Sequence, residues 1–178
     1  MWNEICTIYV IMKYSLFLSA LFLIFLSSCG TEIKKNYIIN DVKLFAEGPL
    51  FDGPNTLQAN YSLDLASVDP ALVQENIKSV KLVKAQISTS DSLGFDRIRS
   101  LVFQATSADV GLQQLAVINP IPKELKTAIL TPSSIADMKE LFRQKQITLI
   151  LDADLEGDLE ENLEYLGNFE FEIVYNQK

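Results

Sequence analysis

The chain has 178 residues, of which 48% are hydrophobic and 21% are charged, and its formal net charge is −8. It contains no histidine, which excludes Ser-His-Asp triads, histidine-ligated zinc and histidine general bases. Its two cysteines, Cys6 and Cys29, both precede residue 36, so the remaining chain offers no disulfide, zinc–thiolate cluster or thiol nucleophile.

The N-terminal region has the order of residue types found in export signals. Lys13 precedes an apolar run over residues 16–26, which is shorter than the ~20 residues of a transmembrane helix. The run ends in Leu26-Ser27-Ser28-Cys29, which resembles the lipobox of bacterial lipoprotein precursors. Met12 is expected to be the true start, because residues 1–11 add Glu4 and no positive charge.

The lipobox resemblance implies a lipid anchor. In that family the chain is cut before the cysteine, so residues 1–28 would be the signal peptide and Cys29 would carry acyl chains. Several acyl chains hold a protein on a membrane stably. Gly30 follows the cysteine where the enterobacterial inner-membrane signal has Asp, so the resemblance favours the outer membrane of the cell envelope. Residues 29–35 are interpreted as the lipidated cysteine and a polar tether.

Apolar and polar residues alternate along the rest of the chain, which is typical of strands with one face in a core. The clearest alternations cover residues 57–65, 147–155 and 169–175. Further strands are predicted over 37–46, 80–88, 98–106, 112–118 and 125–130. About eight strands at this spacing predict a single all-β domain over residues 36–178, an antiparallel β-sandwich of immunoglobulin-like or jelly-roll character.

Two short helices are predicted between the strands. Asp69-Pro70 has the residue types of a helix start, and the helix is expected to continue to Gln74. Ser134 with Asp137 is similar to a capping box, and the apolar side of the helix is expected to consist of Ile135, Met138, Leu141 and Phe142.

Acidic residues concentrate near the C-terminus, where residues 152–178 contain nine Asp and Glu against one Lys. Four of them, Asp152, Asp154, Glu156 and Asp158, are spaced like the start of an EF-hand loop, with Gly157 at its sixth position. Leu163 stands where that loop needs its final Glu, so the alternatives are a calcium site of another type or a solvated acidic strand face.

The function expected from the sequence is a non-catalytic binding or accessory role on a lipid anchor. The partners expected are the membrane and another envelope protein. The lack of a basic face argues against nucleic acid. One alternative is a calcium- or carbohydrate-binding module that uses residues 152–164, with Tyr37, Tyr61, Tyr165 and Tyr175 available for sugar contacts. A weaker alternative is a hydrolase that uses paired carboxylates. The sequence predicts no cofactor, apart from the calcium of the first alternative.

Overall fold

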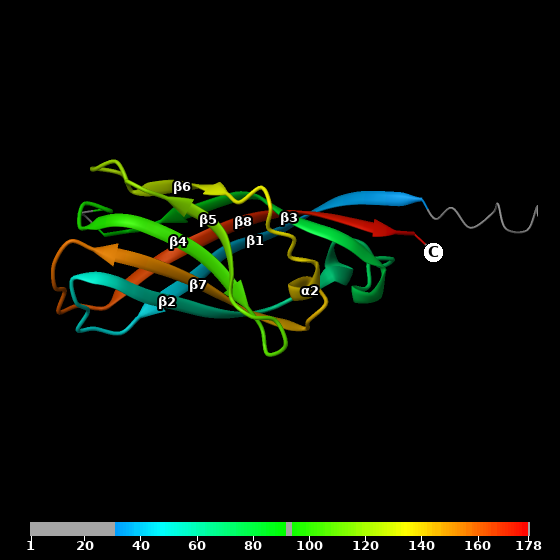
Figure 1. The fold of residues 1–178 in the computed structure, drawn as a ribbon, viewed down its shortest axis with the longest axis horizontal. Coiled ribbons are helices and arrows are strands. Elements are labelled where there is room, and N and C mark those ends of the chain that lie inside the picture. The colour runs from blue at the N-terminus through cyan, green and yellow to red at the C-terminus, as the bar shows by residue number, and fades with distance from the viewer. Residues whose placement is uncertain (1–30, 92–93, 178) are drawn as a thin grey trace, which may run out of the picture. The chain divides into compact units, whose positions relative to one another are not determined.

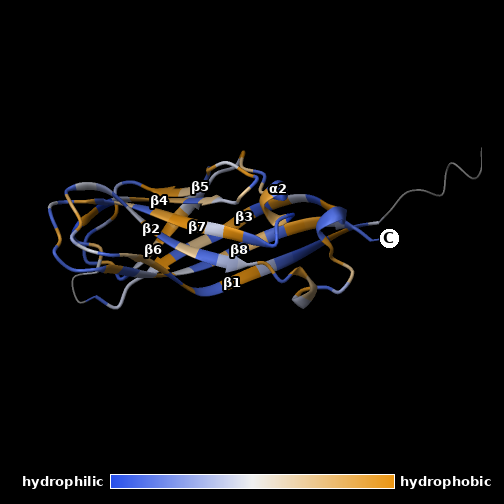
Figure 2. Cartoon of the chain, turned by 90° about the horizontal axis from the view of Figure 1, so that it is seen from below, coloured by the Kyte–Doolittle hydropathy of each residue, from blue (hydrophilic) through white to orange (hydrophobic). Residues whose placement is uncertain are grey.

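The computed structural model describes residues 31–91 and 94–177, which form eight antiparallel strands. The strands are β1 (Glu32–Ala46), β2 (Gly53–Ser62), β3 (Ile77–Ser88), β4 (Ile98–Thr106), β5 (Gln113–Ile118), β6 (Thr127–Pro132), β7 (Gln146–Leu155) and β8 (Leu163–Asn176). Buried and more exposed residues alternate along them, most regularly in β7 and β8, and hydropathy changes along the strands accordingly (Figure 2). The predicted all-β class is confirmed.

The strands pair in a nested order. β1 pairs with β8, β2 with β7, β3 with β6 and β4 with β5, all antiparallel. Pairing of β3 with β8 and of β4 with β7 joins them into two sheets, ordered β1-β8-β3-β6 and β2-β7-β4-β5. The sheets are closed on each other by one register pair between β1 and β2 and two between β5 and β6. A long hairpin rolled up in this way is a jelly roll, one of the two predicted sandwich types.

The core lies between the inner faces of the two sheets. Phe103 of β4 stacks on Phe169 of β8, with ring centroids 4.1 Å apart. Near the ends of these strands Phe142 packs against Phe171 and, edge-on, against Tyr37. All five aromatic side chains are buried, and burial of this apolar surface is the main source of stability for such a domain.

One end of the sandwich, the helical end, holds both termini of the described chain (Figure 1). Here Glu32 at the start of β1 pairs with Asn176 at the end of β8. The connections at this end contain two 3₁₀ turns, η2 (Leu65–Ser67) and η3 (Gln74–Asn76), and the helix α2 (Lys139–Phe142).

The opposite end, the loop end, is where Ala46 of β1 pairs with Leu163 of β8. Four connections lie at this end, over residues 47–52, 89–97, 119–126 and 156–162. Each of these loops joins a strand that ends at the loop end (β1, β3, β5 or β7) to the next strand, which starts there.

The first predicted helix is absent. Residues 69–73 form turns, and η3 follows. The Asp69 carboxylate accepts hydrogen bonds from the Ala71 N–H, at 2.8 Å, and from the Tyr175 hydroxyl, at 2.7 Å. Leu72 is buried in the core. These tertiary contacts hold the segment in a turn, which overrides the local helix signal.

The second predicted helix is shorter than expected, because α2 covers only residues 139–142. The Asp137 carboxylate accepts hydrogen bonds from the N–H groups of Val80 and Lys139, each at 3.0 Å. Ser134 does not cap the helix, and Ile135 is 92% exposed, so neither takes its predicted role. The bond to β3 fixes the backbone around Asp137 and prevents the helix from starting earlier.

The start of the domain also differs from the prediction. β1 begins at Glu32, so residues 32–35, predicted as tether, are part of the sheet, in register with residues 173–176 of β8. Their polar side chains face solvent along an outer strand, which gives them the composition of a linker. The predicted signal peptide and Cys29 lie outside the described residues. Within residues 31–91 and 94–177 no helix combines the length and apolar character needed to cross a membrane.

Candidate binding site at the loop end

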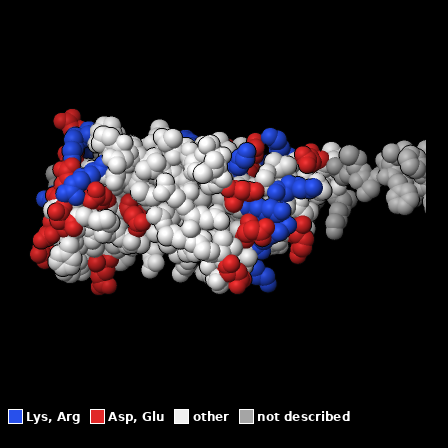
Figure 3. Space-filling model, in the orientation of Figure 1, with Lys and Arg blue, Asp and Glu red and all other residues white. Residues whose placement is uncertain are grey.

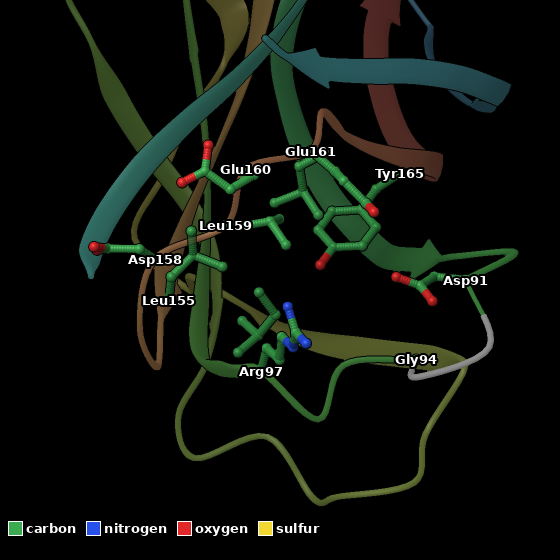
Figure 4. A pocket seen from close by; sticks show the side chains of 11 residues that line it. Asp91, Gly94, Arg97, Leu155, Asp158, Leu159, Glu160, Glu161 and Tyr165 are labelled. Carbon is green, nitrogen blue, oxygen red and sulfur yellow. The ribbon is translucent and has the colours of Figure 1, made fainter. Parts of the chain in front are cut away.

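A cavity of about 410 Å³ opens at the loop end, between the β3–β4 and β7–β8 loops (Figure 4). Its apolar lining comes from Ile98, Leu155, Leu159 and Leu163. The polar lining consists of Asp91, Arg97, Asp158, Glu160, Glu161 and Tyr165. The volume is within the range of pockets that hold small ligands.

Backbone bonds between loops hold the walls of this cavity. Leu50 and Leu159 exchange two backbone hydrogen bonds, of 2.8 and 2.9 Å, which join the β1–β2 and β7–β8 loops. The Glu156 N–H donates to the Arg97 carbonyl at 2.8 Å, which joins the β7–β8 and β3–β4 loops. The site is therefore built by loops that are far apart in the sequence and tied together at the backbone.

Gly94 allows the β3–β4 loop to approach the β5–β6 loop. Its φ is +61°, and a side chain there would collide with the Leu125 carbonyl oxygen. That oxygen accepts a hydrogen bond from the Phe95 N–H at 3.0 Å. Glycine is the residue that tolerates both the positive φ and the close contact.

An ion-pair network lies beside the cavity on the outer face of the sheet. The Arg99 guanidinium contacts Asp52 at 2.6 Å and Asp154 at 2.9 Å. The hydrogen bond from Arg99, with a second from the Gly157 N–H, lowers the pKa of Asp52. Lys123 contacts Glu156 at 2.7 Å and the Asp96 carbonyl at the same distance. These ion pairs link the β1–β2, β5–β6 and β7–β8 connections to one another and to β4 and β7.

Two side chains that form no hydrogen bond or ion pair with a described residue point into the cavity (Figure 4). Tyr165 is 2% exposed, and its ring packs against Phe95 with centroids 5.0 Å apart. Burial raises the pKa of Tyr165, so its hydroxyl remains protonated and able to donate. The Arg97 guanidinium extends into the same space and is exposed.

The four predicted calcium ligands do not come together. Asp152 accepts hydrogen bonds from Thr56 and Gln104, at 2.7 and 3.0 Å. Asp154 and Glu156 are paired with Arg99 and Lys123 as described, and the Asp158 carboxylate accepts from the Asp52 N–H at 2.9 Å. Among the described residues no group of three or more acidic side chains is placed to hold a metal ion. The prediction of a calcium site here is not supported, because Asp152 and Asp154 are spaced along β7, Glu156 and Asp158 follow it in the loop, and each of the four has another partner.

The predicted carbohydrate platform is not formed either. Tyr37, Tyr165 and Tyr175 are buried, and Tyr61 is only partly exposed, so these four tyrosines present no open ring for a sugar to stack on. The acidic stretch over 152–164 nevertheless contributes to the cavity through Asp158, Glu160 and Glu161. Arg97 was not singled out by sequence reasoning, since a lone arginine in a loop carries no motif.

Charge is unevenly distributed over the outside of the molecule. In the view of Figure 3, acidic and basic side chains gather toward both ends, and a band across the middle is largely uncharged. The loop end in particular carries the acidic residues that line the cavity. This distribution makes the ends the places where charged ligands would be recognised.

Neither a protein-family model nor a curated protein matches this chain. Among solved structures, the VP2 subviral particle of infectious bursal disease virus is similar at 11% identity and a TM-score of 0.41, over 81% of this chain and 33% of that one. Mud crab tombus-like virus is similar at 9% identity and a TM-score of 0.36, over 83% and 81% of the two chains. Likeness at this level carries no information about function, and the fold assignment rests on the strand order itself.

Proposed function

We propose that this chain is a lipid-anchored protein of the cell envelope, attached to the outer membrane through Cys29. Its domain binds another envelope protein at the loop end and performs no catalysis. The lipobox-like sequence Leu26-Ser27-Ser28-Cys29 supports the anchor. The position of the cavity relative to the start of β1 supports the binding surface, and this is the observation that carries the proposal.

The start of β1 and the cavity lie at opposite ends of the sandwich. Cys29 precedes Glu32 by three residues, and Glu32 begins β1 at the helical end. The cavity lies at the loop end, where Leu163 pairs with Ala46. The 15 residues of β1 separate the two ends, and at ~3.3 Å per residue this is on the order of 50 Å. A lipid on Cys29 connects to the domain through the start of β1, at the end opposite the cavity, and this supports a loop end that is available to a partner.

Charge favours the same orientation. Asp158, Glu160 and Glu161 line the cavity, and the chain as a whole has a net charge of −8. Anionic headgroups repel acidic surfaces within about a Debye length. The loop end is thus poorly suited to contact such a membrane and available to a partner.

Fractionation of cells that produce the full chain tests the anchor. The Cys29→Ala variant should move from the membrane to the soluble fraction and lose incorporation of labelled palmitate. Ser28→Ala is the matched control and should behave like wild type, because it keeps a small residue before Cys29 in the lipobox-like sequence. Retention of Cys29→Ala in the membrane would rule out this anchor.

Site-specific photocrosslinking tests the binding surface. A photoreactive residue replaces Glu160, at the cavity, or Asp109, in the β4–β5 connection at the helical end. Position 160 should give one dominant crosslinked protein in native membranes, and position 109 should not. Crosslinks from position 109 alone would reject the loop end as the binding surface.

A further inference from the structure

The Tyr165 hydroxyl faces the cavity and forms no hydrogen bond with a described residue. The residue is 2% exposed, yet it appears in no hydrogen bond among the described residues, whereas the buried Tyr175 donates to Asp69 at 2.7 Å. Figure 4 shows its oxygen turned into the cavity. Because the hydroxyl borders the cavity and no described residue accepts its proton, a ligand that accepts a hydrogen bond can pair with it there.

Arg97 faces the same space from the opposite side. Its guanidinium forms no ion pair with a described residue, while the neighbouring Arg99 binds Asp52 and Asp154. In Figure 4 the guanidinium extends toward the region that the Tyr165 hydroxyl faces. Two donors that converge from opposite walls, one of them cationic, are suited to a carboxylate.

The remaining lining adds an apolar and an acidic zone. Leu155 and Leu159 lie beside the two donors. Glu160 and Glu161 line the cavity as well, and neither side chain forms a hydrogen bond or ion pair with a described residue. A ligand that fits all three zones has a carboxylate, an apolar group next to it, and a positive charge a few atoms away.

We propose that the cavity binds the carboxyl-terminal end of a peptide, with an apolar last residue and a basic residue before it. The carboxylate lies between Arg97 and the Tyr165 hydroxyl, the apolar side chain contacts Leu155 and Leu159, and the basic side chain meets Glu160 and Glu161. Capture of a terminal carboxylate is a known mode of peptide recognition. This inference rests on the proposed function and specifies which group of the partner the loop end holds. A short free peptide shares the same chemistry.

Calorimetric titration of the full-length chain in detergent micelles tests the proposal. The probes are N-acetyl-Gly-Gly-Lys-Leu with a free carboxylate, the same peptide as the amide, and the free dipeptide Lys-Leu. The acid should bind at least about tenfold more tightly than the amide, the loss expected when charge-assisted hydrogen bonds are removed. Tight binding of the free dipeptide alone would support the same site with a free peptide as its source.

Variants at the two donors supply the decisive comparison. Arg97→Gln and Tyr165→Phe should each raise the Kd of the peptide with the free carboxylate. Each should also reduce the ratio between the Kd of the amide peptide and the Kd of the acid peptide. Arg143→Gln and Tyr175→Phe make the same chemical changes at the helical end and should leave binding unchanged. Arg97 is exposed, so its variant tests the cavity without disturbing the core.

The outcomes separate this proposal from the one before it. Equal binding of acid and amide, or no binding of any probe at millimolar concentration, would overturn the carboxylate site. If crosslinking from position 160 still captured a partner, only the ligand class would be wrong. If neither peptide binding nor a crosslink from position 160 were observed, the loop end would also be rejected as the binding surface.

Discussion

Two buried tyrosines have opposite surroundings at the residue scale. Tyr175 donates its hydroxyl proton to Asp69 at the helical end, and Tyr165 directs its hydroxyl into the cavity at the loop end. Burial raises the pKa of Tyr175 to about 12, and the bond to Asp69 adds to this effect. The Tyr175 hydroxyl, which has a hydrogen-bond partner, contributes to folding. The Tyr165 hydroxyl forms no hydrogen bond with a described residue and faces the cavity.

The bond between Tyr175 and Asp69 predicts a pH-dependent contribution to stability. The Tyr175 hydroxyl and then the Ala71 N–H lower the pKa of Asp69. The contribution is therefore complete above the unfolded value of about 3.9 and is lost as pH falls through the lower folded value. Asp69→Asn should lower the free energy of unfolding at neutral pH, with a difference from wild type that shrinks below about pH 4.

Urea unfolding at neutral and acidic pH measures this difference. Asp109→Asn serves as the control, because Asp109 is exposed in the β4–β5 connection and forms no ion pair with a described residue. An Asp69→Asn deficit that stays constant from neutral to acidic pH would contradict the assigned role.

At the scale of elements, Asp137 fixes where α2 begins. Its carboxylate bonds to Val80 of β3 and to Lys139 at the start of the helix, while Ser134 is exposed. Asp137→Ala should reduce the free energy of unfolding by about 1–2 kcal/mol, through loss of two bonds to backbone N–H groups. Ser134→Ala should change it by less than about 0.5 kcal/mol. If Ser134→Ala also lowered the free energy of unfolding by about 1–2 kcal/mol, Ser134 would be the helix cap that the sequence predicts.

β8 accommodates an aromatic ring over a glycine. A side-chain carbon at Gly167 would lie 2.5 Å from the Phe169 ring and 3.4 Å from Leu44. Gly167→Ala should therefore lower the free energy of unfolding by about 1–3 kcal/mol, as overpacking does in a filled core. Gly111→Ala is the control, because nothing lies within 4 Å of its position. Thermal unfolding of both variants measures the effect, and a harmless Gly167→Ala would show that Phe169 can move aside.

On the scale of the whole molecule, the acidic C-terminal stretch is distributed among different partners. Each partner contacts one of the acids on or just after β7. The partners come from β2 (Thr56), from β4 (Arg99 and Gln104) and from the β5–β6 connection (Lys123). Exposed pairs of this kind contribute little stability individually. They do neutralise the acids locally and position the loops that frame the cavity.

Calcium should therefore leave the stability of the protein unchanged. Asp152, Asp154 and Glu156 already bind protein groups, so a cation would have to displace them. We expect the Tm of the full chain to be the same with chelator and with millimolar calcium, measured by differential scanning fluorimetry. A rise in Tm that grows with the logarithm of calcium concentration would reveal a site of the kind first predicted.

Strand positions could be predicted from the sequence because the signal for them is local. The predicted range 98–106 coincides with β4, and 147–155 differs from β7 by one residue. Alternation of apolar and polar residues reports which face is buried whatever the neighbouring strand is. The lipobox-like motif is likewise contiguous, so the prediction of an anchor at Cys29 needs no structure.

Strand order, helix length and the cavity depended on contacts between residues far apart in the chain. The bond from Asp137 to Val80 shortens a helix that local spacing predicts, and Tyr175 draws Asp69 into a turn. Arg97 and Tyr165 line one cavity only because β3, β4, β7 and β8 bring their loops to one end. The sequence by itself determined the class of fold and the predicted anchor, since both depend on neighbouring residues. Tertiary structure alone decided the jelly-roll order and the cavity at the loop end, because both arise from non-local pairing.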